Sequence, residues 1–375
     1  MNSTYPKLFI KKTSITCWSI FIVLLFFAGF RWDVGIDWPM YMASLRPDHF
    51  FFASYEPLIR NLVGILQRHN FIDPGYALFI IAFFILFFFF YSIQDFSLSP
   101  VLSTLLFICL GIYFDSLNGV RQFVSIALFV FSWKYLFEKQ AVRYFVIIII
   151  AAGFHISALL MLPVYFFIHH KFSRRFFIIV FSISIPLMFL VDAIILRIVI
   201  PIILGIPRFS AYGETYYRFL LSNPNPLAYL RIIFPSIIFV FCILLYNRLT
   251  KNNIVLLNLS MIYIIVTILF PSTMLMIRIA FYFQAALIFL IPLISKQLTK
   301  NGSLLFNIST LIYGILFIYV TQISRPINNI APFTMDFRLA SVRLLFLLLS
   351  CLFFSIVFIK ILYKLDLKFK IVWKK

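Results

Sequence analysis

Acidic residues are scarce in this chain of 375 residues, where 12 Asp and Glu stand against 32 Lys and Arg and the formal net charge is +20. Several catalytic motifs are missing altogether: there is no glycine-rich phosphate loop, no DxD that would hold a metal, and no GxSxG or HExxH. The four cysteines lie within apolar runs, at spacings that suit neither zinc nor a disulfide framework. These absences argue against a soluble nucleotide-sugar enzyme and against a disulfide-stapled secreted domain.

Apolar residues dominate the amino-acid composition. At 63% hydrophobic residues, the chain has more apolar surface than a soluble core could hide, so lipid is its natural solvent. No internal repeat and no Gly/Ser-rich linker divides it, and apolar runs long enough to cross a bilayer recur along its length. We therefore predict a single all-α polytopic membrane domain over residues 1–375, with about 11–12 transmembrane helices.

The predicted spans begin with an apolar run at residues 15–30 that resembles a signal peptide. Because no small-x-small cleavage site precedes Arg31, we expect this run to be kept as the first span. The largest external loops are expected at about residues 31–73, 199–228 and 322–339. The spans are predicted at residues 14–30, 74–94, 98–114, 119–137, 142–153, 155–169, 175–198, 229–246, 253–270, 274–294, 303–321 and 340–363.

The stretch from residue 142 to 169 is long enough for only one tilted helix, yet basic residues flank it at both ends. Lys139 and Arg143 lie at its start, and Arg174 lies just beyond its end. The positive-inside rule places both flanks in the cytoplasm. We therefore predict a hairpin of two short helices, with a turn at Gly153-Phe154-His155 that faces protein or a water-filled cavity.

With that hairpin, all 15 lysines and both termini fall on the cytoplasmic side, whereas 13 of the 17 arginines fall on the outer side. Arginine grips phosphate with a planar fork that lysine lacks, so outer arginines without lysines indicate a phosphate-bearing ligand. Some of them will pair with the eight outer acidic residues, which are too few to neutralise all 13. The outer arginines are Arg31, Arg46, Arg60, Arg68, Arg121, Arg197, Arg208, Arg218, Arg231, Arg278, Arg325, Arg338 and Arg343.

Four of these arginines, Arg121, Arg231, Arg278 and Arg343, are expected in the first turns of a helix at its outer end. A helix N-terminus carries partial positive charge and free N–H groups, so arginines there reinforce an anion site. The alternatives are intramembrane salt bridges for Arg121 and Arg278 and snorkelling to the interface for Arg343. Gln122, beside Arg121, also needs a polar partner at membrane depth.

Candidate groups for proton transfer are His155, Asp37 and Glu214. His155 is the one histidine predicted inside a span, and it could act as a base or as a hydrogen-bond donor to a diphosphate. Asp37 and Glu214 lie in the first and second external loops, whose aromatics, carboxylates and arginines suit sugars; Arg208 and Tyr212 belong to the second loop. Arginines alone could stabilise a diphosphate leaving group, so no metal is required.

Five sequence motifs resemble the EpsG-like branch of the Wzy polysaccharide polymerases, which includes O-antigen polymerases, and they occur in the same order as in that family. The block from NxxRQ to FHxSAL is the most specific part, and Trp38 stands where the pattern has a tyrosine. The motifs cover the chain from about residue 30 to 295. They are GIDWPMY at residues 35–41 followed by Glu56-Pro57, NGVRQ at 118–122, GFHISALLMLP at 153–163, RFSAY at 208–212, and RIAFYF at 278–283 with Pro292 downstream.

This resemblance implies a bacterial inner-membrane glycosyltransferase with a GT-C-like membrane fold and an active-site cavity facing the periplasm. Its substrates would be undecaprenyl-diphosphate-linked oligosaccharide repeat units, joined into the O-antigen of lipopolysaccharide or a related surface polysaccharide. Because they stand in the matching motifs, the resemblance implies that Arg121, His155 and Arg278 are site residues. The resemblance implies no cofactor and no nucleic-acid partner, and it suggests a chain-length regulator protein as a partner.

Two other functions fit parts of the pattern. A flippase for lipid-linked oligosaccharides would also have a cationic cavity, but inverted repeats with matched broken helices would be expected, and only one broken hairpin is predicted here. A membrane acyltransferase acting on surface glycans would need access for its acyl donor from the cytoplasm, and the cytoplasmic loops are short. Both remain alternatives to the polymerase.

Overall fold

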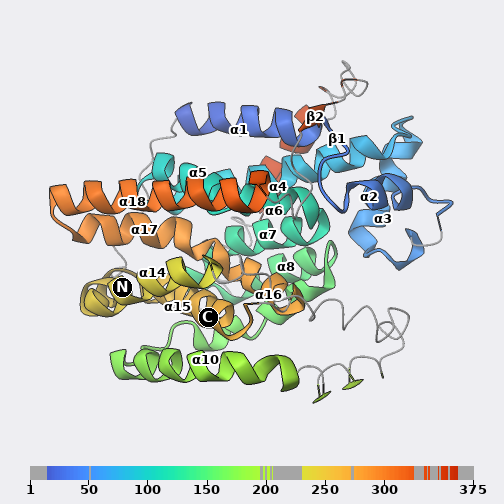
Figure 1. Ribbon diagram of the computed structural model, residues 1–375. Coiled ribbons are helices and arrows are strands. Elements are labelled where there is room, and N and C mark those ends of the chain that lie inside the picture. Colours follow the sequence, from blue (N-terminus) through green and yellow to red (C-terminus); the bar gives the residue numbers. More distant parts are fainter. Residues whose placement is uncertain are drawn as a thin grey trace, which may run out of the picture. The chain divides into compact units, whose positions relative to one another are not determined.

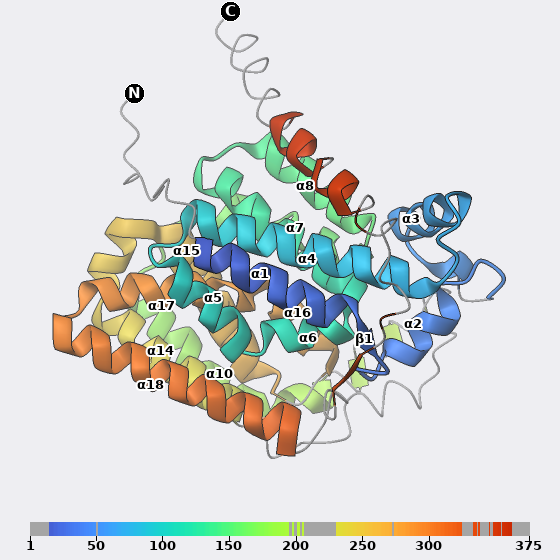
Figure 2. The ribbon, with the colours of Figure 1, turned by 90° about the horizontal axis from the view of Figure 1, so that it is seen from above.

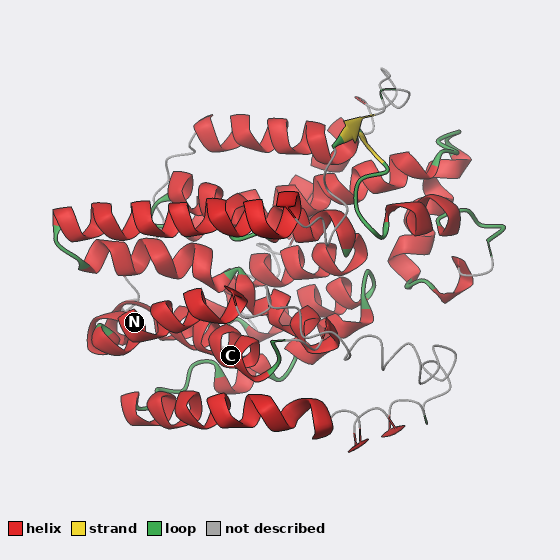
Figure 3. Cartoon of the chain, viewed as in Figure 1, coloured by secondary structure: helices red, strands yellow, loops and turns green. Residues whose placement is uncertain are grey.

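The computed structural model of the protein is built almost entirely from helices (Figure 3), which confirms the predicted all-α class. Within the described part of the chain, the sheet content is one antiparallel pair, β1 (Arg31–Trp32) with β2 (Thr334–Met335). The structure describes residues 15–49, 52–194, 197–198, 201–202, 205, 230–271, 274–324, 333–335, 337, 345, 348–353 and 355–361.

Four helices in the described residues are long and apolar enough to cross a membrane: α4 (Pro74–Phe96), α7 (Val120–Phe137), α10 (Arg174–Ile194) and α18 (Lys300–Ile318). Two bent pairs raise this number to six if each pair is one span. They are α5 (Pro100–Cys109) with α6 (Ile112–Asn118), bent by 51°, and α16 (Met274–Gln284) with α17 (Ala286–Gln297), bent by 44°.

Shorter apolar helices account for most of the other predicted spans. They include α1 (Ile15–Gly29), α8 (Ala141–Ala152), α14 (Leu230–Leu244) and the part of α15 (Tyr246–Leu269) that follows Asn253. These features show a membrane-embedded, multi-pass protein. The predicted total of about 11–12 spans stays a prediction, because part of the 340–363 segment lies outside the described residues.

The chain packs as two compact units, each made of discontinuous stretches. The first unit comprises Phe9–Thr104, Tyr113–Phe166 and Gln322–Lys375, and the second comprises Met1–Leu8, Leu105–Ile112 and Phe167–Thr321. The prediction of a single domain over residues 1–375 is neither confirmed nor contradicted by this division.

The first unit is centred on α4 and α7, which pack against each other (Figure 2). Both helices are deeply buried, as expected for helices surrounded by other helices. Helix α1 lies against the other side of α4, and a Cβ added at Gly29 would come within 2.3 Å of the Phe79 ring. Glycine therefore permits the close approach at the end of α1, just before β1.

The predicted hairpin is present in the first unit. Helix α8 ends at Ala152, the chain turns through Gly153-Phe154-His155, and the 3-10 helix η2 (Ile156–Met161) packs back against α8. The Tyr144 hydroxyl donates to the Met161 carbonyl at 2.5 Å, which holds the two arms together. The second arm differs from the single helix predicted at 155–169: Pro163, which has no amide hydrogen, separates η2 from the short α9 (Val164–Phe167).

Three short helices follow β1 in the first unit and lead to α4: α2 (Trp38–Ser44), the 3-10 helix η1 (Phe52–Ser54) and α3 (Pro57–Arg68). Figure 1 shows α2 and α3. Helix α3 is amphipathic and, with 12 residues, shorter than a span. Its amide at Leu58 donates to the Gly153 carbonyl at 3.0 Å, so the start of α3 docks on the turn of the hairpin. A Cβ at Gly153 would come within 2.6 Å of Leu58, which explains the glycine there.

The second unit is organised around α15, which packs against α10, α14, α16 and α17, while α17 packs against α18. Asn253 breaks the helical conformation inside α15, and its side-chain oxygen accepts from the Leu256 amide at 2.9 Å, so Asn253 acts as the N-cap of the apolar part. A short π-helix, η5 (Tyr319–Ser324), follows α18.

Candidate functional site

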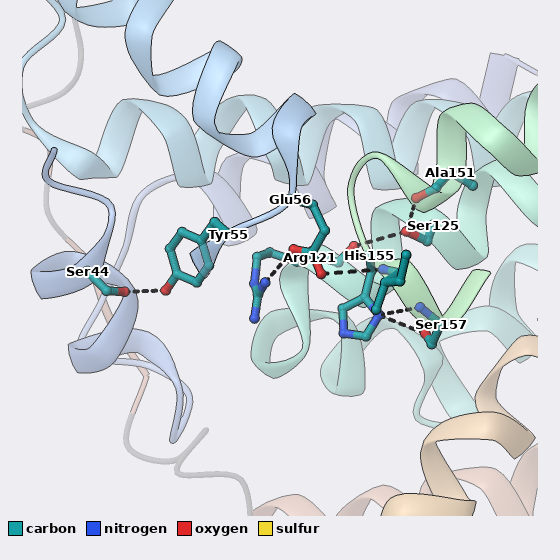
Figure 4. Close-up of polar contacts among 9 residues, drawn as sticks. Ser44, Tyr55, Glu56, Arg121, Ser125, Ala151, His155 and Ser157 are labelled. Atoms are coloured by element: carbon teal, nitrogen blue, oxygen red, sulfur yellow. Dashed lines mark hydrogen bonds and ion pairs between the residues drawn. The ribbon is translucent and has the colours of Figure 1, made fainter. Parts of the chain in front are cut away.

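A buried glutamate, Glu56, joins three segments that are far apart in the sequence (Figure 4). One oxygen of its carboxylate accepts from Arg121 Nη1 at 2.6 Å, and the other accepts from the backbone amide of Ile156 at 3.3 Å. Arg121 lies at the start of α7, and Ile156 follows the turn of the hairpin. The Glu56-Pro57, NGVRQ and GFHIS motifs therefore meet at one carboxylate.

The local sequence explains how Glu56 reaches this position. Pro57 disfavours helical geometry at the preceding residue, and Glu56 has an extended backbone (φ −62°, ψ 152°) as the N-cap of α3. Its side chain does not cap its own helix, and is used instead for α7 and the hairpin. The residue that precedes α3 thus carries a carboxylate that points inward.

Arg121 is held by several contacts besides Glu56. Its guanidinium lies 4.3 Å from the centre of the Tyr55 ring, and the Tyr41 hydroxyl is within hydrogen-bonding reach. Tyr55 is itself fixed by a hydrogen bond between its hydroxyl and Ser44. The salt-bridge alternative for Arg121 is therefore realised. Its Nε atom is buried without a hydrogen-bond partner among the described residues, so the fork is not saturated.

Tyr41 is a neutral component of this cluster. It is buried, and burial raises the pKa of its hydroxyl, an effect that Arg121 partly opposes and Asp37 reinforces. The hydroxyl therefore stays protonated at neutral pH. Asp37, predicted as a base, is the half-buried N-cap residue of α2, and its charge is felt at Tyr41.

His155 lies at the junction of the hairpin turn and η2, where it is the N-cap residue. Its Nδ1 accepts from the Ser157 amide at 3.3 Å and is 2.7 Å from the Ser157 hydroxyl. A neutral imidazole whose Nδ1 accepts a hydrogen bond carries its proton on Nε2. This assignment, made from the hydrogen-bond geometry, makes Nε2 a donor. The neighbouring Ile156 amide binds Glu56, so His155 sits next to the Glu56–Arg121 pair.

Gln122 follows Arg121 on α7, is 5% exposed and turns away from solvent. One turn further on, the Ser125 hydroxyl donates to the Ala151 carbonyl at 2.7 Å and ties α7 to the end of α8. The hairpin turn is thus fixed from both sides, by Ser125 on α7 and by Glu56 at the start of α3.

The other predicted site residues lie in the second unit or outside the described residues. Arg231 on α14 and Arg278 on α16 belong to the second unit, where Arg278 is exposed and Arg231 half-buried. Arg208, Tyr212, Glu214 and Arg343 lie outside the described residues. Their predicted roles stay predictions.

Two further polar groups were not singled out from the sequence. The guanidinium of Arg31 is 6% exposed, and none of its three nitrogens has a hydrogen-bond partner within the described ranges. The amide of Asn118, the first residue of NGVRQ, is buried and likewise without a partner among described residues. Gly35 packs on that amide: its φ is +103°, and a Cβ there would lie 2.9 Å from the Asn118 oxygen.

The two arginines near Tyr41 differ in their partners. Arg121 is paired with Glu56, and the charge of Asp37 also acts on Tyr41. Arg31 interacts electrostatically with Tyr41 as well, but it makes no ion pair with a carboxylate among the described residues. Arg31 is therefore a buried cation without an acidic partner in the described part of the chain.

A model of the EpsG family matches residues 14–335, which span all the motifs described above. No curated protein and no solved structure matches the chain.

Proposed function

Because the chain belongs to the EpsG family, we propose that it is a membrane glycosyltransferase that polymerises lipid-diphosphate-linked oligosaccharide repeat units. The family indicates a polysaccharide polymerase-type membrane protein. The observation that carries the finer proposal is the meeting of three of these motifs at a buried carboxylate that holds an arginine beside a histidine donor. A second buried guanidinium, that of Arg31, has no hydrogen-bond partner among the described residues. Such a site suits a diphosphate and a sugar.

In the proposed reaction, a hydroxyl at the non-reducing end of one lipid-linked unit attacks the anomeric carbon of the growing chain. The glycosidic bond forms as the bond between that carbon and the lipid diphosphate breaks, and the diphosphate leaves with the electron pair. The proton of the attacking hydroxyl passes to a base. The carrier would be undecaprenyl diphosphate, and the product an O-antigen or related surface polysaccharide.

The residues of the cluster fit distinct steps. Arg121, oriented by Glu56 and Tyr55, would receive negative charge from the departing diphosphate. His155 Nε2–H would donate to the same group, since the Nδ1 contact with the Ser157 amide favours the donor role over the base role. Glu56 has both oxygens engaged and acts as a positioning residue.

The base is proposed to be Asp37 or Glu214. Asp37 neighbours Tyr41 and hence the Arg121 cluster, whereas Glu214 lies outside the described residues. Gln122, Arg208, Tyr212, Arg231, Arg278 and Arg343 are proposed as further substrate-binding residues. We also propose that both termini are cytoplasmic and that the site faces the periplasm of the inner membrane, because the lysines and arginines segregate in the predicted topology.

The test is the polysaccharide ladder of cells that lack this gene. The proposal predicts that the ladder disappears while a single repeat unit still reaches the outer side of the membrane, on the lipid carrier or transferred from it. Complementation with the wild-type gene should restore the ladder. If no repeat unit appears on the outer side, the proposal is wrong and a flippase is indicated.

A further inference from the structure

Arg31 lines a small cavity of about 20 Å³ in the first unit. Trp32, Trp38 and Asp73 line the same cavity, and Gly29 forms part of its wall. The two indole rings form an edge-to-face pair with centres 4.8 Å apart. Trp38 is buried, but Trp32 is 37% exposed, so the cavity has an aromatic rim that solutes can reach.

Nothing in the described structure neutralises Arg31. Burial lowers the pKa of its guanidinium to about 10, which still leaves it charged at neutral pH. The side chains that act on it electrostatically are those of Tyr113 and Tyr41, whose hydroxyls are uncharged at neutral pH. The Tyr113 hydroxyl is already committed as a donor to the Leu24 carbonyl, at 3.0 Å. A buried cation without an anion is costly, so the arrangement is suited to an anion supplied from outside.

Asp73 does not fill this role. Its Oδ1 accepts from the Gly75 amide at 2.7 Å and caps α4, and it makes no ion pair with Arg31 in the described part of the chain. It is half-buried at the edge of the cavity. There it can accept hydrogen bonds from hydroxyl groups, as carboxylates beside aromatic rings do in sugar sites.

The size of the cavity restricts the anion. One water needs roughly 10–15 Å³ of such volume, so about 20 Å³ accommodates a group with one or two polar atoms. A planar carboxylate, whose two oxygens match the fork of a guanidinium, meets this limit. A diphosphate, with its two tetrahedral centres, does not.

We propose that the Arg31 cavity binds the carboxylate of an acidic sugar, whose ring lies against Trp32 and whose hydroxyls reach Asp73. Aromatic rings accept the C–H faces of sugars, which gives Trp32 its role. The proposal rests on the proposed function only for the source of the ligand: the sugar would be part of the repeat unit. The polymer made by this protein should then contain a uronic or nonulosonic acid.

The test measures the binding of small sugars to the purified full-length protein in detergent, and the change in tryptophan fluorescence reports the binding. The probes are methyl glucuronide and N-acetylneuraminate, with methyl glucoside as the neutral match and inorganic phosphate as the competing anion. At least one acidic sugar should bind saturably and about tenfold or more tightly than methyl glucoside. Arg31→Gln should abolish this preference, and Arg60→Gln, which changes an exposed arginine on α3, should keep it.

Equal binding of the acidic and neutral sugars, no binding of either acidic sugar, or an unchanged preference in Arg31→Gln would overturn the proposal. Tighter binding of phosphate than of both acidic sugars would do the same. A thermal unfolding scan distinguishes a ligand-binding role of Arg31 from a purely structural one. Without ligand, the Arg31→Gln variant should unfold at the same temperature as wild type or at a higher one. A clearly lower temperature would show that Arg31 is already satisfied, and would also overturn the proposal.

This binding assay does not depend on polymerisation. If acidic sugars bind as described but the cells polymerise normally without the gene, the proposed function is wrong and the Arg31 site stands. If the gene is required for the ladder but the polymer contains no acidic sugar, the proposed function stands and the Arg31 site is wrong.

Discussion

Removing both charges of the Glu56–Arg121 pair should cost much less stability than the two single removals added together. The Glu56 and Arg121 side chains are only 5% and 19% exposed, and the ion pair is 2.6 Å long. Removing one partner of a buried pair leaves an uncompensated charge, which typically costs about 3–5 kcal/mol. We therefore expect Glu56→Gln and Arg121→Met each to lower the free energy of unfolding by about 3 kcal/mol or more.

The double variant has no unpaired buried charge at this site. Its loss of unfolding free energy should therefore be smaller than the sum of the two single losses by about 2–3 kcal/mol. The assay is unfolding of the purified protein by SDS in mixed micelles, followed by tryptophan fluorescence. The pair of Lys134 and Asp95, 2.9 Å long and 25% and 21% exposed, is the matched control. It should couple by about 1 kcal/mol or less because it is better solvated. Additive losses at Glu56 and Arg121 would refute the reasoning.

The remaining predictions concern the same site. Gly153→Ala should destabilise the protein by about 1–3 kcal/mol, because the new methyl group would overlap Leu58. Gly64→Ala is the control and should not destabilise it, because the space around Gly64 is open. Equal effects of the two variants in the same unfolding assay would contradict the docking of α3 on the hairpin. Arg121→Lys should strongly reduce polymer length while membrane insertion is unchanged, since an ammonium lacks the guanidinium fork; a normal ladder would count against ligand contact. A cysteine at His155 should react with a membrane-impermeant thiol reagent from the outer side; labelling from the cytoplasm alone would contradict the proposed topology.

The sequence predicted the framework well because long apolar runs leave few choices. The spans at 74–94, 119–137 and 175–198 correspond to α4, α7 and α10 within a few residues. The hairpin followed from basic residues at both of its ends, and its turn lies where Gly153 predicted it. Bends were missed: 98–114 and 274–294 are each two helices at an angle. The first break contains Gly111, whose φ of +82° does not continue a helix.

The partners of polar residues could not be predicted from the sequence. Arg121 was expected to contact a ligand or an acid, but nothing local shows that the acid is Glu56, 65 residues away. In the sequence, Glu56 resembles an ordinary residue at the start of an amphipathic helix, and its inward direction depends on Pro57 and on the docking of α3. Arg31 was counted among the outer arginines, yet only the structure reveals that it is buried beside two tryptophans without an anion.

The most direct test of the central claim is a reconstituted reaction. The full-length protein in liposomes is supplied with purified lipid-diphosphate-linked repeat units and EDTA, and the products are examined by mass spectrometry. The account predicts lipid-linked products of two or more repeats together with released lipid diphosphate, and a strong loss of both with Arg121→Lys. Repeat units that cross the bilayer without being joined would contradict it.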